Sequence, residues 1–202
     1  MKKVIMLFSL LFGLLFVANA DAENAKTILD KAAAQLKAAG NVKAEFSVSV
    51  NGNISNGNLC LSGSKFVCST DAVKSWFDGK TMWHYVVAND EVNVTNPSVS
   101  ETARMNPYSF LNLYKKGYKC EMGKSTAADY EVILTGEAGA TFTSIVVRLS
   151  KQTYQPTYIK TIGKKVTTEI AVKSLKKNQK FSDATFKFNK SKYPNVEIID
   201  LR

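Results

Sequence analysis

The segment DGKTMWHYVV, residues 78–87, combines a tight-turn signal with a strand that is apolar on both faces. A two-residue hairpin turn needs positive φ at both positions, so Asp78-Gly79 predicts such a hairpin. The strand that follows has two apolar faces: Met82 and Val86 on one side, and Trp83, Tyr85 and Val87 on the other. An antiparallel sheet with one wet face would instead alternate apolar and polar residues. The segment therefore predicts either a sheet between two covering layers, as in a sandwich, or a curved sheet with a hydrophobic concave side.

Short strands separated by turn pairs continue on both sides of this segment. Upstream, Phe46, Val48 and Val50 alternate with polar residues until Asn51-Gly52 ends the run. Further turn pairs are Asn56-Gly57, Ser62-Gly63 and Asn89-Asp90, and later strands are expected at Tyr130–Thr135, Phe142–Ser150, Tyr158–Thr161, Val166–Lys173, Thr185–Phe188 and Val196–Leu201. These spacings leave no room for crossover helices, so we expect an antiparallel sheet.

Two segments have the pattern of helices. Residues 22–39 carry an apolar stripe and are followed by Gly40, a helix-stop signal. The stripe consists of Ala25, Ile28, Leu29, Ala32, Ala33 and Leu36. Asn106-Pro107 predicts the start of a second, strongly apolar helix, which ends at the cationic turn 115–117. This helix either plugs one end of the sheet or covers part of its concave face. Two helices cannot easily cover both faces, so a partly covered concavity is the more economical interpretation.

The first twenty residues have the pattern of a secretory signal peptide. Lys2 and Lys3 precede an apolar run over 4–17, and Ala18-Asn19-Ala20 supplies the small residues of a cleavage site. The run is shorter than the roughly 20 residues of a membrane-spanning helix, although a short membrane anchor is the alternative. No Cys follows the run, so we do not expect a lipid-anchored protein. We expect cleavage after Ala20 and one exported, soluble domain over 21–202.

The composition is that of an ordinary globular protein, with 45% hydrophobic and 22% charged residues. The formal net charge of +10 would suit nucleic acid, but export separates the chain from it, so we expect no nucleic-acid partner. The lysines are spread along the chain. They form either a solvated surface or a field that steers the protein toward anionic headgroups or an acidic partner, which would allow transient contact with a membrane surface.

Few residues are available for catalysis or metal binding. His84 is the single histidine and lies in the middle of a strand, where a structural role is expected. No phosphate-binding loop, paired-Cys zinc spacing or nucleophile elbow is present in the sequence. We therefore expect no catalytic residue, metal or cofactor, and no enzymatic activity. Three pairings of Cys60, Cys68 and Cys120 are possible. Cys60 and Cys68 flank a tight turn, and we predict that they pair and leave Cys120 reduced.

Several motifs together resemble the LolA-type periplasmic lipoprotein carriers. Residues 78–85 resemble a D-G-K-T-L/M-W-x-Y segment of that family. In the same order as in the family, an Ala/Leu-rich helix leads into Val42–Phe46, and Gly57-Asn58-Leu59 precedes a turn and Lys65-Phe66. Asn106–Leu111 and Phe181–Phe188 also match, so the resemblance covers essentially all of 21–202.

The resemblance implies an open, incomplete antiparallel β-barrel with a helical lid over a hydrophobic cavity. It implies a monomeric carrier that takes lipoprotein acyl chains from an inner-membrane ABC transporter and ferries lipoproteins to the outer membrane. A carrier of another lipid, such as a glycolipid, phospholipid or isoprenoid, would use the same cavity and is the alternative. From the strand pattern, the cavity-wall candidates are Phe46, Val48, Phe66, Trp83 and Tyr85, and the lid candidates are Tyr108, Phe110, Leu111 and Leu113.

One departure from the family concerns the control of the lid. Members of the family carry an arginine at the start of the strand that contains the matching Phe, where it bonds to the lid. The corresponding residues 61–66 contain no arginine. Lys65 lies nearby, but an ammonium group is a point donor without the planar fork of a guanidinium. The arginine latch is therefore not expected in this chain.

Overall fold

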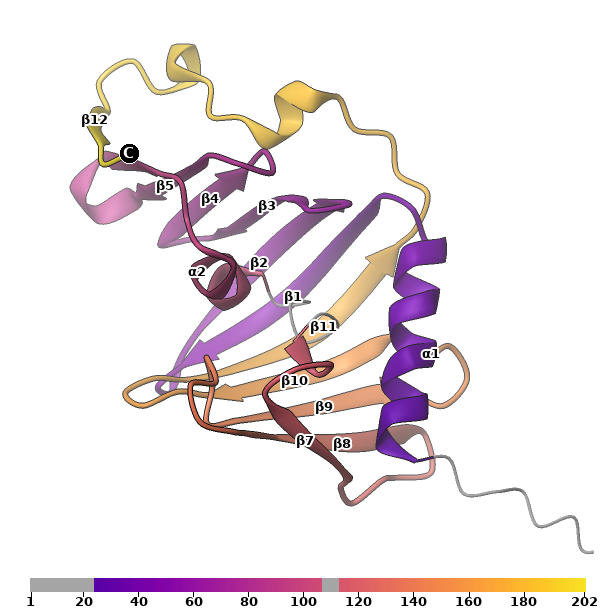
Figure 1. Cartoon of the computed structure of the whole chain (residues 1–202). Coiled ribbons are helices and arrows are strands. Elements are labelled where there is room, and N and C mark those ends of the chain that lie inside the picture. The colour runs from indigo at the N-terminus through magenta and orange to yellow at the C-terminus, as the bar shows by residue number, and fades with distance from the viewer. Residues whose placement is uncertain (1–23, 107–112) are drawn as a thin grey trace, which may run out of the picture.

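The computed structural model describes residues 24–106 and 113–202, apart from the side chains of 103–105. This part of the chain contains two α-helices, three short 3₁₀ helices and twelve strands (Figure 1). The helices are α1 (Ala25–Ala38), α2 (Val99–Met105), η1 (Val87–Asn89), η2 (Asp183–Phe186) and η3 (Lys190–Lys192). The strands are β1 (Val42–Val50), β2 (Asn53–Ser62), β3 (Lys65–Thr70), β4 (Val73–Phe77), β5 (Met82–Val86), β6 (Glu91–Thr95), β7 (Tyr118–Met122), β8 (Asp129–Gly136), β9 (Ser144–Ser150), β10 (Pro156–Ile162), β11 (Thr167–Lys176) and β12 (Glu197–Asp200).

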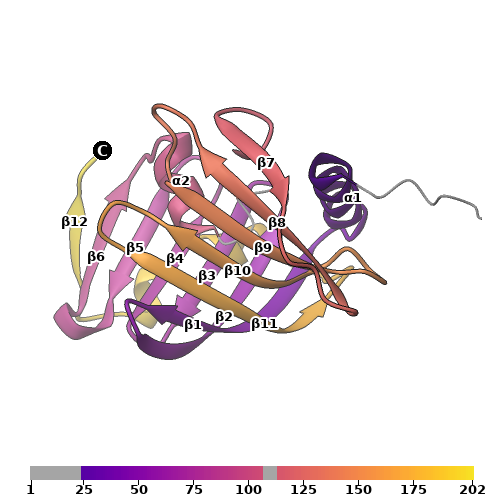
Figure 2. The same cartoon turned by 90° about the horizontal axis from the view of Figure 1, so that it is seen from below.

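All twelve strands belong to one strongly curved sheet in the order β12-β6-β5-β4-β3-β2-β1-β11-β10-β9-β8-β7. Two meanders, β1–β6 and β7–β11, meet where β1 pairs with β11, and the free edges are β7 and β12 (Figure 2). The mainly-β fold and the open, incomplete barrel are therefore as predicted. The expectation of a purely antiparallel sheet is wrong at one edge, because β12 pairs parallel to β6. A long C-terminal connection makes this parallel pair possible.

The predicted turns hold at some positions and fail at others. Asn51 and Gly52 both have positive φ and make the two-residue hairpin turn between β1 and β2. The hairpin predicted at Asp78-Gly79 is present between β4 and β5, but its two-residue length is wrong. The connection has four residues, 78–81, and within it the Asp78 carboxylate accepts the backbone N–H of Thr81 at 2.8 Å. Gly57 lies inside β2 and not in a turn, because the strand needs a residue without a side chain at this point.

The N-terminal helix is confirmed, with Asn24 as its N-cap and Ala25, Ile28, Leu29 and Ala32 buried. It lies across one end of the sheet, at the right of Figure 1. Helix α2 was not predicted, although Ser98 and Glu101 form a capping box that is visible in the sequence. Most of the predicted helix at 107–116 lies outside the described residues.

Both faces of the sheet carry apolar clusters. The inner cluster joins α1 to the concave face of most strands. On the outer face of β3–β6, the C-terminal segment 181–196 covers Val67, Trp76 and Val92 with a series of aromatic residues. The Trp76 ring, for example, lies 5.5 Å from Phe188 and 5.8 Å from Tyr193 between centroids. The strand predicted at Thr185–Phe188 is wrong, because this cover begins as the 3₁₀ helix η2.

The predicted disulfide is wrong as well. Cys60 pairs across the sheet with Val67, and Cys68 pairs with Leu59, so the two cysteines are offset by one residue. An offset of one residue places side chains on opposite faces of a sheet. Accordingly, Cys60 belongs to the outer cluster and Cys68 to the inner cluster, and all three cysteines are free.

Candidate functional site

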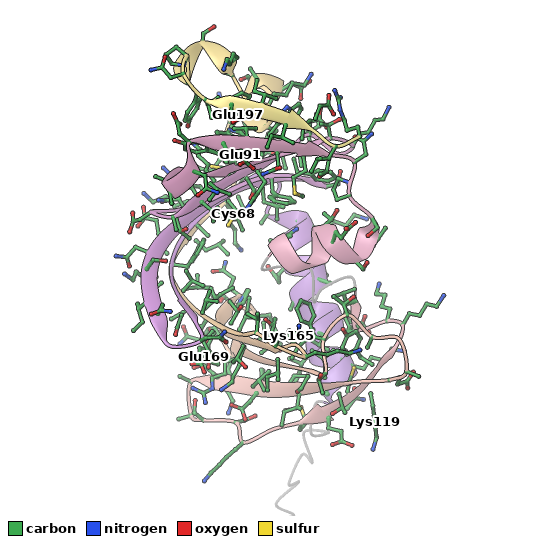
Figure 3. All side chains as sticks on the ribbon, turned by 90° about the vertical axis from the view of Figure 1, so that its left-hand side faces the viewer. Cys68, Glu91, Lys119, Lys165, Glu169 and Glu197 are labelled. Carbon is green, nitrogen blue, oxygen red and sulfur yellow. The ribbon has the colours of Figure 1, made fainter. Side chains whose placement is uncertain are left out.

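The concave face of the sheet encloses a cavity of about 1320 Å³. This exceeds the roughly 300–1,000 Å³ of common small-molecule pockets. Figure 3 looks along the curve of the sheet into this hollow. Helix α1 closes one end of the sheet, and the hairpin tips β1–β2 and β10–β11 lie at the other end, at the lower left of Figure 1.

Aliphatic and aromatic side chains from both meanders form the cavity walls. The first meander supplies Phe46 and Val48 from β1, which confirms their predicted position. The second meander contributes residues that were not predicted: Phe142, Ile145, Ile159 and Ile170. Their strands were recognised in the sequence, but only the long-range pairing of β1 with β11 brings them opposite Phe46.

The other predicted wall residues lie elsewhere. Phe66 is fully buried in the inner core, where it packs against Phe77 at 5.4 Å between ring centroids, and it does not reach the cavity surface. Trp83 and Tyr85 are on the outer face, beneath the C-terminal segment, so their assignment to the wall is wrong. Sequence alone could not choose the face of β5, because Met82 and Val86 make its inner side apolar as well.

Three of the predicted lid residues, Tyr108, Phe110 and Leu111, lie outside the described residues. Leu113 is partly buried and packs against the inner cluster. The hydroxyl of its neighbour Tyr114 donates a hydrogen bond to the Asp30 carboxylate, and this bond ties the chain after residue 112 to α1. Burial, with the Asp30 bond second, raises the pKa of Tyr114.

The mouth of the cavity exposes apolar side chains beside lysines. Val50, Ile54 and Val166 line the cavity and yet are 40%, 77% and 46% exposed. Lys164 and Lys165 lie next to them in the β10–β11 turn, and Figure 3 labels Lys165 at the hollow. The two hairpins are bonded to each other, because the Asn51 N–H donates to the Thr167 carbonyl and the Thr167 N–H donates to Asn51 Oδ1, both at 3.0 Å. The mouth is therefore a single apolar and basic lip.

A small polar group interrupts the apolar wall. Ser75 Oγ and His84 Nδ1 lie 2.8 Å apart, and both residues line the cavity beside Cys68. Burial lowers the pKa of His84, and burial raises the pKa of Cys68 to about 12. At neutral pH the wall therefore holds a neutral imidazole and a protonated thiol. No ionised nucleophile results from this arrangement.

Lys65, the basic residue near the position of the missing arginine latch, has another partner. Lys65 Nζ lies 2.6 Å from the Asp183 carboxylate of η2, so Lys65 holds the C-terminal segment. Among the described residues, no cluster of three or more His, Cys, Asp or Glu side chains could hold a metal ion. Within the same ranges, no helix has both the length and the apolar character needed to cross a membrane.

Comparisons with known proteins agree with this architecture. The model of a protein family described as outer membrane lipoprotein carrier protein LolA matches residues 15–165. A conserved protein of Thermus thermophilus superposes with a TM-score of 0.61 at 10% identity, covering 87% of this chain and 98% of that one, which shows a shared fold. A LolA superfamily protein from Nitrosomonas europaea gives a TM-score of 0.46 at 10% identity, over 83% of this chain and 99% of that one. No protein of curated function matches the chain in sequence.

Proposed function

Because the chain belongs to the family of outer membrane lipoprotein carrier proteins, we propose that it binds the acyl chains of lipoproteins in its cavity and ferries lipoproteins from the inner to the outer membrane. The observation that carries this proposal is the large cavity with apolar walls on the concave face. The carrier acts as a monomer in the periplasm, and the leader-like residues 1–20 and the family support this location.

The cavity is suited to acyl chains for an energetic reason. Burial of each CH₂ group is worth about 0.8 kcal/mol, so a palmitoyl chain exposed to water costs on the order of 12 kcal/mol. A lipidated protein can cross an aqueous compartment only if these chains are covered. Apolar walls supply the cover without directional bonds, which lets the chains slide in and out. Polar side chains also line the cavity, but most of the lining surface is apolar, and this disfavours a water-soluble ligand of this size.

The lip suits loading and delivery at membranes. Three exposed apolar side chains beside two lysines match the boundary between acyl chains and anionic headgroups. We infer that the lip makes the transient membrane contact through which cargo enters from an inner-membrane ABC transporter. No step of this transfer requires catalysis by the protein.

Recovery of the cargo tests the proposal. The protein is purified from its native compartment without detergent, and the bound material is identified by mass spectrometry. A lipidated polypeptide supports the lipoprotein carrier, and a free glycolipid, phospholipid or isoprenoid would replace it with a carrier of that lipid. Depletion of the protein is expected to leave outer-membrane lipoproteins in the inner membrane. Normal lipoprotein sorting after depletion would contradict the proposal.

A further inference from the structure

Three of the polar residues that line the cavity form a row across neighbouring strands. Cys68 on β3 is the cross-strand partner of Ser75 on β4, and Ser75 is the partner of His84 on β5. All three line the cavity, and Figure 3 shows Cys68 on the wall of the hollow. Partners in register share one face of the sheet, so this row places a hydroxyl, an imidazole and a thiol side by side within the apolar wall.

Ser75 and His84 satisfy only part of their hydrogen-bonding capacity. The Ser75 side chain is buried, at 5% exposure, and its bond to Nδ1 is 2.8 Å long. Because burial keeps the His84 ring neutral at neutral pH, one ring nitrogen carries a proton and the other accepts. We assign the serine hydroxyl as the donor to Nδ1, and this assignment places the ring proton on Nε2. No described residue bonds to Nε2, so the wall offers one N–H donor to the cavity.

A donor in an apolar wall favours a particular class of ligand. An N–H group without a partner, away from water, loses the free energy of a hydrogen bond. An ionised headgroup is disfavoured at the row, because desolvation of a charge is costly and the charged residues that line the cavity, Glu137, Lys164 and Lys165, lie in the turns at its mouth. The group that fits is uncharged, accepts a hydrogen bond and is attached to a long apolar chain. The carbonyl of an ester or amide at the head of an acyl chain has these properties.

We propose that Ser75 and His84, in the row beside Cys68, form a polar subsite that binds the ester or amide carbonyl of the carried lipid. The inference rests on the proposed function, because it assigns a position to the polar end of a lipid within the same cavity. The His84 Nε2–H donates to the carbonyl oxygen, and Ser75 fixes the tautomer and the orientation of the ring. The subsite makes the cavity selective for acylated lipids over plain hydrocarbons.

Two fluorescent probes test the subsite, a long-chain fatty acid methyl ester and an alkane of matching length. Both are titrated into the full-length mature protein. His84→Phe keeps a ring in the wall but removes the donor, and is expected to weaken ester binding about three- to tenfold while alkane binding is unchanged or stronger. In His84→Phe the buried Ser75 hydroxyl loses its hydrogen-bond partner. The double variant Ser75→Ala/His84→Phe removes this hydroxyl as well, and it should show the same selective loss of ester binding. Thermal unfolding confirms that both variants are folded.

The matched control is Thr161→Val, which removes a hydroxyl from the cavity wall on β10. It should leave the ratio of ester to alkane affinity as in the wild type. Equal changes for the two probes in the His84 variants would overturn the subsite while leaving the carrier function intact. Failure of the wild type to bind either probe would overturn the proposed function and the subsite together. Release of free fatty acid from the ester would also overturn the proposed binding subsite, because Ser75 would then act as a nucleophile.

Discussion

The ring of Phe46 lies over the backbone of Gly57 on the neighbouring strand, where a Cβ on residue 57 would come within 2.3 Å of the ring. The two residues are cross-strand partners on β1 and β2, and Phe46 forms part of the cavity wall. The same Cβ would lie 2.8 Å from the Ser69 carbonyl oxygen on β3. Gly57 therefore makes room for a wall residue, and the shape of the cavity depends on the absence of a side chain at this position.

Gly57→Ala should destabilise the fold and displace the Phe46 ring. Over-packing of this kind costs about 1–3 kcal/mol, measured as the free energy of unfolding in urea. Phe46→Leu shortens the side chain above residue 57, so the double variant should cost less than the sum of the two single variants. If the losses of unfolding free energy in the two single variants add up exactly in the double variant, the clash with the Phe46 ring is contradicted. The contact with the Ser69 carbonyl would then explain the destabilisation by Gly57→Ala.

The stability of the protein should fall as the pH decreases below about 6.5 because of His84. Burial lowers the pKa of His84 in the folded state, so the unfolded chain binds more protons in this range and the free energy of unfolding decreases with decreasing pH. His84 is the single histidine of the chain. His84→Gln should therefore remove the pH dependence between about pH 7 and the folded-state pKa. The same slope in wild type and variant would show that another group is responsible.

Ile54→Glu should weaken binding to vesicles that contain anionic lipid by about tenfold, with little effect on folding. Ile54 is 77% exposed at the lip, so a charge there costs the folded state little but would have to be desolvated at a membrane. Co-sedimentation at low and high salt measures the effect. Leu201→Glu is the matched control, because Leu201 is 61% exposed near the C-terminus, far from the lip in Figure 1. Equal losses for both variants would argue against a role of the lip.

Apolar packing should hold the C-terminal segment more firmly than its ion pair does. Phe186 is 2% exposed on the outer face, and Phe186→Ala is expected to cost about 3–5 kcal/mol in unfolding free energy. The Asp183 side chain is 80% exposed, so Asp183→Asn should lower the free energy of unfolding far less than Phe186→Ala does, despite the 2.6 Å contact with Lys65. A larger loss for Asp183→Asn than for Phe186→Ala would reverse this order.

The cysteines should all be free thiols in the isolated protein. Alkylation in denaturant without a reductant is expected to modify each of Cys60, Cys68 and Cys120. A peptide in which Cys60 is bridged to Cys68 would contradict the register of β2 and β3.

Local patterns in the sequence were sufficient to predict much of the fold. The apolar stripe of α1 and the turn at Asn51-Gly52 depend on residues close together in the chain, and both are present. The curved, open sheet also follows from short strands with two apolar faces. The predictions that failed depend on register or on distant contacts. The pairing of Cys60 with Cys68 failed because a shift of one residue reverses the face of every side chain.

The same limit explains the errors in the candidate site. Trp83 and Tyr85 are as apolar as any wall residue, and only the C-terminal cover from beyond residue 180 reveals that they face outward. The sequence also could not predict that Ser75 bonds to His84, because these residues meet across a turn whose length was misjudged. Phe46 and Val48 were placed correctly, since the other face of β1 is polar.

The seam between β1 and β11 sets the order in which the barrel can be completed. Lys43 pairs with Lys176 and Val50 with Thr168, so the centre of the sheet joins segments from opposite ends of the chain. During synthesis the first meander can form early, but β1 remains a bare edge until β11 arrives. Pairing between strands that are far apart in the sequence forms slowly. Until it forms, the unpaired backbone groups of β1 can bond to strands of other chains. A chain truncated before β11 would therefore retain neighbouring hairpins and aggregate through β1.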